Sequence, residues 1–411
     1  MTAMGGLFQG DGLPRAGGAG RARRWRSFAS RVAVLTAVLI ALVLVVPARS
    51  DAPAPEPTSA PEAAEPFHMP PPPDGVRGVY VTGALAASPQ MDRLLDRLAG
   101  TEINTIVLEL KDELGRITFR SSNPLAQAMG AVRGELGDLR ALVDRLHRRG
   151  FYVVGRMVAF RDHRLALQRP ELALKDVQGN IWRDRQGIAW INPAQEEAWA
   201  YLIDLAVEAA LAGVDEIQWD YVRFPTDGPL DRLVYPEGIR REETIAAFLA
   251  ASRQALRPVG AYTSADLFGF AALTRGDMGI GHQLEVLAEQ VDVVSLMLYP
   301  SHFPPGALGL EDPDRAPYET VLRSLKAAAQ RVDRRKLRPW LQSFSLRNPY
   351  GPQEVWAQIL AAQEVEVSGW LLWNPSGRYT TPRQLMGSTA PVQEAALQRP
   401  VEKEGVDEPR G

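Results

Sequence analysis

From residue 78 to residue 375 the chain alternates between short β-forming apolar runs and longer amphipathic stretches with helical spacing. Such alternation predicts parallel strands, because an intervening helix returns the chain to the same edge of the sheet before the next strand begins. Eight such units in about 300 residues is the number expected for a (β/α)8 TIM barrel. The predicted strands are residues 78–83, 105–112, 152–160, 216–224, 259–269, 291–300, 338–344 and 369–375, and the predicted helices are 91–100, 139–150, 195–213, 242–256, 283–290, 318–330 and 352–363.

A doubly wound open sheet is the alternative fold, and it fits less well because no glycine-rich phosphate loop follows the first predicted strand. No repeat with a period of 20–50 residues indicates a solenoid. The longest connections follow the second, third, fourth and sixth predicted strands. In a barrel they lie on the C-terminal face, where active sites are found. They are residues 113–138, 161–194, 225–241 and 301–317.

The first 74 residues have the composition of an export signal and a spacer. A basic stretch, residues 21–31, precedes an uncharged apolar run, residues 32–46, which fits a signal-peptide core and is short for a full membrane span. Ala48 and Ser50 are small residues at positions −3 and −1 for cleavage after Ser50, and the alternative is an uncleaved signal anchor with its basic side in the cytoplasm. The predicted segments are 1–50 as signal peptide or anchor, 51–74 as a Pro/Ala-rich linker, 75–388 as the barrel and 389–411 as a polar tail.

Charge and composition limit the partners and cofactors of the folded part. Six arginines and one aspartate in residues 1–31 give a local charge of +5, which leaves −8 for the remainder of a chain with a net charge of −3. An acidic body argues against nucleic acid as a partner. The chain has no cysteine, and its five histidines lack the close spacing of zinc ligands, so we expect no metal or other cofactor. We expect a monomer whose only membrane contact is the apolar run, residues 32–46, if it stays uncleaved.

The strongest candidates for catalysis are two aspartates at the ends of neighbouring predicted strands. Asp220 shares a strand face with Gln218, and Asp266 shares one with Ser264, because side chains alternate along a strand. If both faces look into the barrel, two carboxyls meet at its mouth about 4.8 Å apart, the spacing of neighbouring strands. Paired carboxyls at roughly this distance are what retaining glycoside hydrolysis requires. Glu109 is the reserve acid.

Aromatic and polar side chains near the same strand ends are candidates for sugar contacts. Aromatic faces suit sugar rings because both combine an apolar surface with polar edges. Arg223 is expected to pair with a neighbouring carboxylate and so to orient Asp220. The candidate substrate-binding residues are Arg156, Arg223, Trp219, Tyr299, His302, Gln342, Trp373 and Asn374.

At these residues the sequence resembles the putative glycosyl hydrolase domain family, formerly a domain of unknown function, near the glycosyl-hydrolase-like 10 and alpha-amylase-like barrels. The resemblance runs in order from Gly75 to Tyr379 and implies a (β/α)8 fold, export and action on a polysaccharide. It also implies that Asp220 and Asp266 are the carboxylates of the fourth and fifth strands. The matching stretches are VRGVYVTG, INTIVLELKDELGRITFRS, GRMVAFRD, WINPAQEEAW, GVDEIQWDYVRFP, SADLFGF, VDVVSLMLYPSHF and GWLLWNP.

The sequence therefore predicts an exported glycoside hydrolase, periplasmic or extracellular, that cleaves a polysaccharide or oligosaccharide, with Asp220 as nucleophile and Asp266 as general acid/base. An inverting variant would use Asp220 as base instead. The alternative from another class is a non-catalytic carbohydrate-binding protein of the cell envelope, which needs the aromatic rim but not the carboxyl pair. A third possibility is a lyase or transglycosylase that uses the same carboxylates.

The basic stretch and the apolar run predict that a reporter fused after Ala60 crosses the cytoplasmic membrane. Reporter activity should appear outside the cytoplasm, and deletion of residues 32–46 should return it to the cytoplasm, because the apolar core is what the export machinery recognises. Cell fractionation checks both fusions. A cytoplasmic reporter in the undeleted fusion would contradict the prediction.

Overall fold

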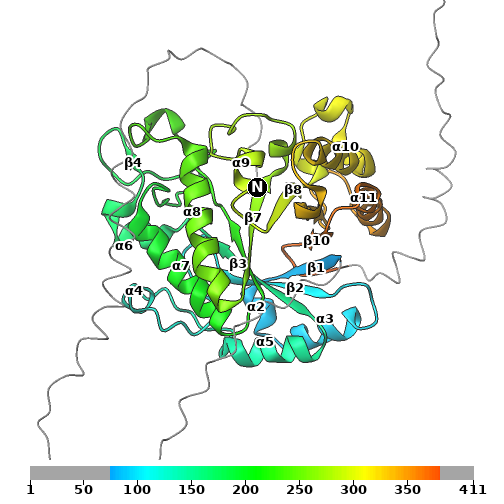
Figure 1. Cartoon of the computed structure of the whole chain (residues 1–411), viewed down its shortest axis with the longest axis horizontal. Coiled ribbons are helices and arrows are strands. Elements are labelled where there is room, and N and C mark those ends of the chain that lie inside the picture. Colours follow the sequence, from blue (N-terminus) through cyan, green and yellow to red (C-terminus); the bar gives the residue numbers. More distant parts are fainter. Residues whose placement is uncertain (1–74, 380–411) are drawn as a thin grey trace, which may run out of the picture. The chain divides into compact units, whose positions relative to one another are not determined.

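The computed structural model describes residues 75–379, and within them eight parallel strands close into a barrel (Figure 1). Around the barrel the strand order is β1-β10-β9-β8-β7-β5-β3-β2, so each barrel strand pairs with the next along the chain and the last pairs with the first. The predicted (β/α)8 barrel is confirmed. The barrel strands are β1 (Val76–Val81), β2 (Thr105–Lys111), β3 (Tyr152–Val158), β5 (Glu216–Asp220), β7 (Tyr262–Phe268), β8 (Val293–Leu298), β9 (Trp340–Gln342) and β10 (Gly369–Trp373).

Helices cover the outside of the barrel, as their apolar stripes predict. In α3 the buried residues Met91, Leu94, Leu95 and Leu98 follow the three- and four-residue spacing of one helix face. Figure 1 shows α7 and α8 on one side of the strands and α10 and α11 on the other. The α-helices are α2 (Gly83–Ala86), α3 (Gln90–Leu98), α4 (Pro124–Ala128), α5 (Leu139–Arg148), α6 (His163–Gln168), α7 (Glu196–Leu211), α8 (Arg241–Leu256), α9 (Leu284–Ala288), α10 (Pro317–Ala329) and α11 (Pro352–Val365).

Three expected segments lie wholly outside the described residues: the signal or anchor (1–50), the linker (51–74) and the tail (389–411). Between residues 75 and 379, no helix has both the length and the apolar character needed to cross a membrane.

The strands separate two layers of buried side chains. Side chains that point outward pack against the helices and form the larger apolar cluster, which includes Val79, Ile106 and Trp219. Side chains of the opposite parity point into the barrel, where a smaller and strongly aromatic cluster includes Tyr80 and Trp340. Alternation along each strand therefore decides which residues can reach the barrel mouth.

The barrel interior is polar near the N-terminal ends of the strands. The Glu216 carboxylate forms an ion pair with Arg338, and both side chains are 1% exposed. The Ser264 and Tyr152 hydroxyls donate hydrogen bonds to the same carboxylate. Because a buried charge is costly unless it is paired and hydrogen-bonded, these four side chains must be positioned together.

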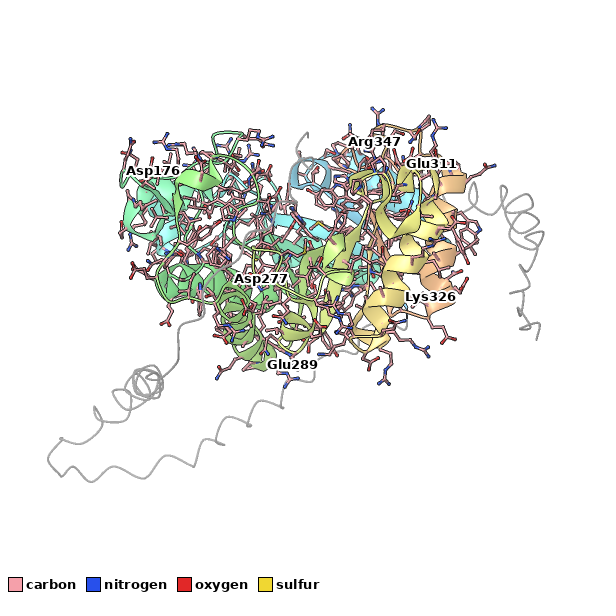
Figure 2. The ribbon with its side chains drawn as sticks, turned by 90° about the horizontal axis from the view of Figure 1, so that it is seen from above. Asp176, Asp277, Glu289, Glu311, Lys326 and Arg347 are labelled. Atoms are coloured by element: carbon pink, nitrogen blue, oxygen red, sulfur yellow. The ribbon has the colours of Figure 1, made fainter. Side chains whose placement is uncertain are left out.

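The two ends of the barrel differ in loop length. Figure 2 shows Asp176, Glu311 and Arg347 along one edge, and Glu289 on the opposite edge. The first three lie in connections that follow strands, whereas Glu289 precedes β8. One of the long connections pairs with another: β4 (Lys175–Asp176) and β6 (Leu233–Val234) form a two-stranded antiparallel sheet. The longer loops thus lie on the C-terminal face of the barrel, as expected.

Contacts between the two ends of the described chain complete the closure of the barrel. Val76 and Gly369 are paired at the junction of β1 and β10. The Tyr379 hydroxyl, 299 residues beyond its partner, donates a 2.6 Å hydrogen bond to the Tyr80 carbonyl oxygen. The eighth strand and the segment after it therefore fix the position of the first strand.

The polar interior predicts a large stability loss for Arg338→Met. This change leaves the Glu216 carboxylate buried without its cation, which should lower the free energy of unfolding by about 3–5 kcal/mol. Arg334→Met is the matched control, because Arg334 pairs with Glu366 at the surface, where the side chains are 55% and 67% exposed. That change should cost less than about 1 kcal/mol. Denaturant unfolding measures both, and equal losses would contradict the assignment.

Candidate active site

Asp220 is the last residue of β5, and its carboxylate is held on both oxygens. Its own chain holds Oδ1, because the Tyr221 backbone N–H donates a 2.6 Å hydrogen bond to that oxygen. This geometry accompanies a left-handed backbone at Tyr221, with φ of 49°, which is strained for a residue with a bulky side chain. The strand therefore stops here and not at residue 224 as predicted. Backbone strain directly after a buried carboxylate is typical of functional sites.

Arg156 joins two carboxylates at the barrel mouth. Its Nε and Nη2 lie 3.0 Å and 2.5 Å from Asp220 Oδ2. Its Nη1 lies 3.5 Å from Glu109 Oε1. The guanidinium carbon also lies 5.6 Å and 5.2 Å from the ring centroids of Tyr80 and Trp373. With only 3% of its surface exposed, Arg156 is a buried cation that these carboxylates and rings together stabilise.

Glu109 reaches the mouth from β2. It accepts a 2.6 Å hydrogen bond from the Tyr80 hydroxyl, and its side chain is 17% exposed. A register shift between Glu109 and Lys111 follows it in the strand. Lys111 does not pair with Glu109 but forms a buried 2.8 Å ion pair with Asp162. Glu109 therefore faces Arg156, and it is the most exposed of the three carboxyls at the mouth.

Asp266 lies on β7, the neighbour of β5. Trp219 of β5 and Ala265 of β7 are paired in register. Asp220 and Asp266 are the next residues of these two adjacent strands, so they lie at the same level of the barrel. The Trp340 indole N–H donates a 2.8 Å hydrogen bond to Asp266 Oδ1. Burial, and then the negative charge of Asp220, raise the pKa of Asp266 well above its ordinary value, although Arg156 opposes them.

Tyr299, His302 and Phe344 form an aromatic cluster beside this pair. The Tyr299 ring contacts the His302 ring at 5.3 Å and the Phe344 ring at 5.6 Å. Burial and the charge of Asp266 raise the Tyr299 pKa, so its hydroxyl is a neutral hydrogen-bonding group. Burial and the charge of Arg347 lower the pKa of His302, so its ring is neutral at pH 7.

The structure thus gathers seven of the sequence candidates and their neighbours at the mouth of one barrel. Two carboxyls on adjacent strands have different environments: one is bonded to a guanidinium, the other to an indole and buried more deeply. Such separation of environments is how one site keeps one carboxyl ionised and another protonated. Within residues 75–379, no group of three His, Asp or Glu side chains has the arrangement of a metal site. The gathered candidates are Glu109, Arg156, Asp220, Asp266, Tyr299, His302 and Trp373.

The expected sugar contact of Trp219 is wrong. Its side chain points out of the barrel, is fully buried, and donates a 2.8 Å hydrogen bond to the Ser252 hydroxyl of α8. Its ring packs against Phe248 at a centroid distance of 5.0 Å. The parity that turns Asp220 inward necessarily turns Trp219 outward.

Gln342 is enclosed by the protein, which corrects its assignment as a substrate contact, whereas Asn374 stays a candidate whose amide is bonded within the protein. Gln342 has no exposed surface, and its amide joins the Ser301 N–H to the Phe344 carbonyl oxygen. The Asn374 amide nitrogen donates to the backbone carbonyl oxygens of two other residues, Ser343 and Arg378. Both side chains hold loops of the C-terminal face, and their hydrogen bonds are made within the protein.

Arg223 does not form the expected ion pair with Asp220. It lies 5.0 Å from the ring centroids of Trp190 and Tyr221 and 4.6 Å from that of Phe268. Its Nη1 donates to the Phe224 carbonyl oxygen at 3.0 Å. Arg156 forms the ion pair with Asp220 that was expected of Arg223.

Tyr80 and Trp340 also lie at the mouth; the sequence places both in the aromatic set at the strand ends, but neither is among the candidate substrate-binding residues. Both were visible as aromatic residues near strand ends, but their parity with Val76 and Gln342 is what turns them inward. Tyr80 stacks on Trp373 at 4.1 Å, and Trp373 meets Trp340 edge-on at 5.5 Å. Trp373 therefore contacts both Tyr80, which donates a hydrogen bond to Glu109, and Trp340, which donates one to Asp266.

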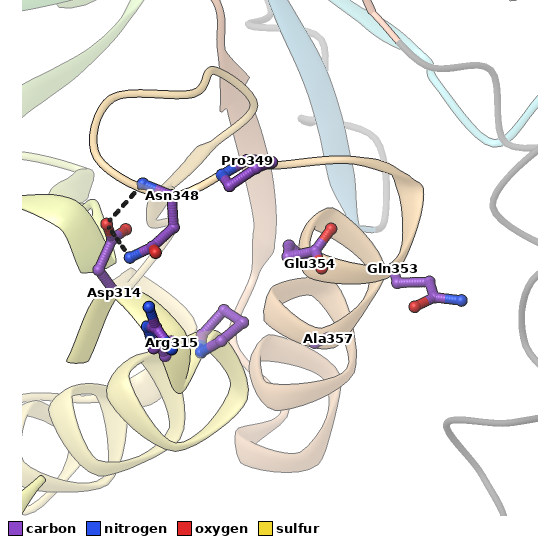
Figure 3. Close-up of a pocket in the computed structure, with 8 residues that line it drawn as sticks. Asp314, Arg315, Asn348, Pro349, Gln353, Glu354 and Ala357 are labelled. Atoms are coloured by element: carbon purple, nitrogen blue, oxygen red, sulfur yellow. Dashed lines mark hydrogen bonds between the residues drawn. The ribbon is translucent and has the colours of Figure 1, made fainter. Parts of the chain in front are cut away.

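A separate pocket of about 400 Å³ lies between the loops after β8 and β9 (Figure 3). The acidic side chains of this pocket make hydrogen bonds within the loops: Asp314 Oδ2 accepts two from Asn348. Glu354 accepts one of 2.8 Å from the Gly351 N–H at the start of α11. This pocket holds none of the carboxyls of the mouth, and the mouth remains the candidate active site.

A closed barrel whose mouth combines a carboxyl pair, a buried guanidinium and stacked aromatic rings defines a carbohydrate-active barrel enzyme. The family described as "Putative glycosyl hydrolase domain" matches residues 78–379, and the chain belongs to this family of glycosidases. A search among curated proteins gave no match.

Two solved structures of low sequence identity share the fold, and a third is similar in sequence to part of the chain. The glycoside hydrolase domain of PgaB (BpsB) from Bordetella bronchiseptica is 14% identical, with a TM-score of 0.57 over 78% of this chain and 97% of that chain. The structure described as the "C-terminal domain of putative chitinase" from Desulfitobacterium hafniense DCB-2 is 13% identical, with a TM-score of 0.50 over 79% of this chain and 100% of that chain. A hypothetical protein from Ruminiclostridium thermocellum ATCC 27405 is 35% identical over 46% of this chain and 96% of that chain, with a TM-score of 0.43.

The raised pKa of Asp266 predicts that Asp266→Asn stabilises the fold above the ordinary aspartate pKa. There the native state binds a proton that the unfolded state has lost, so wild-type stability falls as pH rises toward the native pKa, at up to about 1.4 kcal/mol per pH unit. The asparagine variant lacks this loss, and unfolding curves from pH 3 to pH 8 measure the growing difference.

Asp333→Asn serves as a control of opposite sign. The side-chain hydrogen bond from Arg335 lowers the Asp333 pKa to about 2, so this variant should lose stability at neutral pH and not gain it. A constant difference between wild type and Asp266→Asn across the pH range would contradict the prediction.

Proposed function

We propose that the chain is an exported glycoside hydrolase that cleaves a polysaccharide or oligosaccharide by a retaining mechanism, with Asp220 as nucleophile and Asp266 as general acid/base. The observation that carries this proposal is the pair of carboxyls on adjacent strands in contrasting environments. Strand adjacency supports retention, because retaining enzymes hold their carboxyls about 5–5.5 Å apart.

In the first step Asp266 donates its proton to the glycosidic oxygen while an Asp220 oxygen bonds to the anomeric carbon and the leaving group departs. In the second step the Asp266 carboxylate removes a proton from water, and the oxygen of that water attacks the anomeric carbon and releases Asp220. The raised pKa of Asp266 suits it to hold a proton near neutral pH, and Arg156 supports Asp220 as a charged group.

The remaining groups of the mouth are suited to substrate binding. Trp373 is partly exposed and its ring lies beside Arg156, and Glu109 can accept a hydrogen bond from a sugar hydroxyl. Tyr299 and His302 are neutral hydrogen-bonding groups on the side of Asp266. Export of the enzyme is part of the proposal and rests on the basic stretch and the apolar run of residues 32–46.

The decisive experiment compares Asp220→Asn and Asp266→Asn with wild type on envelope polysaccharides and aryl glycosides. Asp220→Asn should lower kcat by several orders of magnitude, because the amide cannot attack. Asp266→Asn should keep much of its activity on aryl glycosides with good leaving groups, which need little protonation. Asp215→Asn is the control: Asp215 is a buried aspartate just before β5, at the opposite end of the barrel, and its loss should leave kcat unchanged.

Proton NMR of the first-formed product determines whether the anomeric configuration is retained. Inversion would reassign Asp220 as a base. Binding of oligosaccharides by a wild-type protein that hydrolyses none of them would favour the carbohydrate-binding alternative. Loss of activity in Glu109→Gln with normal activity in Asp266→Asn would make Glu109 the acid.

A further inference from the structure

The hydrogen bond between Trp340 and Asp266 joins two side chains that are almost fully enclosed. Trp340 is 1% exposed and Asp266 is 2% exposed, and the indole nitrogen lies 2.8 Å from Asp266 Oδ1. The two residues come from β9 and β7, so the indole reaches past β8, where Met297 is its paired neighbour. Within residues 75–379 it is the only hydrogen bond that the Asp266 carboxyl makes.

An indole N–H can only donate, and this restricts where a proton can sit on Asp266. A neutral carboxyl has one oxygen that accepts and one that carries the proton. Because Oδ1 accepts from Trp340, the proton of the neutral form resides on Oδ2. The same N–H stabilises the charged carboxylate after the proton has left, because a hydrogen bond to an ionised acceptor is stronger than one to a neutral acceptor.

The orientation of the Trp340 ring is set from its other side. Trp373 meets it edge-on at 5.5 Å, and Tyr80 stacks on Trp373 at 4.1 Å with an angle of 24° between the rings. Tyr80 in turn donates to Glu109. The packing of Trp373 and Tyr80 behind the Trp340 ring therefore favours the orientation in which the indole N–H points toward Asp266.

We infer that Trp340 is a positioning residue, which fixes the transferable proton of Asp266 on Oδ2 and stabilises the carboxylate that remains after transfer. This inference deepens the proposed function, on which it rests, since it assigns a partner to the acid/base. The groups that face Asp266 from the surrounding elements are Asp220 from β5, Arg156 from β3, Tyr299 after β8 and Arg338 before β9.

Trp340→Phe tests the inference because it keeps an aromatic ring and removes the N–H. Burial and then Asp220 raise the Asp266 pKa while Trp340 lowers it, so the variant should move the alkaline limb of kcat/KM to higher pH. On substrates with poor leaving groups kcat should fall about tenfold to a hundredfold, as expected for the loss of one hydrogen bond to a charged group. On aryl glycosides with good leaving groups, the rate constant of the first step should fall less.

Trp219→Phe is the matched control. It also removes a buried indole hydrogen bond of 2.8 Å, to Ser252, but on the outer side of the barrel wall. This variant should lose stability and keep the wild-type pH profile. If both variants lose stability alike and neither shifts the alkaline limb, Trp340 is a packing residue and the inference is overturned.

A second measurement does not depend on turnover. In protein labelled with ¹⁵N-tryptophan, the indole resonance of Trp340, identified by its absence in Trp340→Phe, should shift with pH at a midpoint above the ordinary aspartate range. Asp266→Asn should abolish this titration, and the Trp219 resonance should show none. A Trp340 resonance that does not titrate, or that titrates equally in Asp266→Asn, overturns the inference. A titrating resonance in a protein that hydrolyses no glycoside would support the proton placement and refute the proposed function.

Discussion

The arrangement of the barrel mouth depends on one buried positive charge. Arg156 contacts Asp220 directly, approaches Glu109 and lies beside the faces of Tyr80 and Trp373. Without it, two carboxylates would face each other in a poorly solvated space, and like charges so placed strongly disfavour ionisation of one of them. The guanidinium therefore sets the charge that the site can hold, and Asp266, which Arg156 does not bond, is the carboxyl left to accommodate a proton.

The same principle of compensated charge operates one layer deeper. TIM-barrel interiors are most often filled by branched apolar side chains. Here Glu216 and Arg338 form an ion pair in the interior, and Gln218 donates a 3.1 Å hydrogen bond to Ser295. A polar interior stabilises less than an apolar one of equal volume, but it fixes the relative positions of its members, because an unpaired member would be costly. The mouth thus rests on a layer with little freedom to repack.

The sequence was sufficient for the fold and for the position of Asp220 and Asp266 on adjacent strands, because both follow from the period-two and helical spacing of side chains. Parity alone places Asp220 inside the barrel and Trp219 outside it. The prediction that Trp219 contacts sugar was wrong because it ignored this alternation at the end of the strand. Parity could not reveal that loops would enclose Gln342, nor that a left-handed residue would end β5 and that Arg223 would pack on aromatic rings. Such outcomes depend on the path of the loops, which local patterning does not encode.

The pairing of β1 with β10, and the contact of Tyr379 with Tyr80, have a consequence for biosynthesis. The two halves of this junction lie almost 300 residues apart, so the barrel can close only after β10 has been synthesised. Until then a ribosome-bound nascent chain presents two unpaired strand edges, at β1 and at its most recently formed strand, and such edges are prone to association with other chains. The carboxyls of β5 and β7 can acquire their neighbours early, whereas Trp373 arrives with the last strand, so the complete mouth is among the final features to assemble.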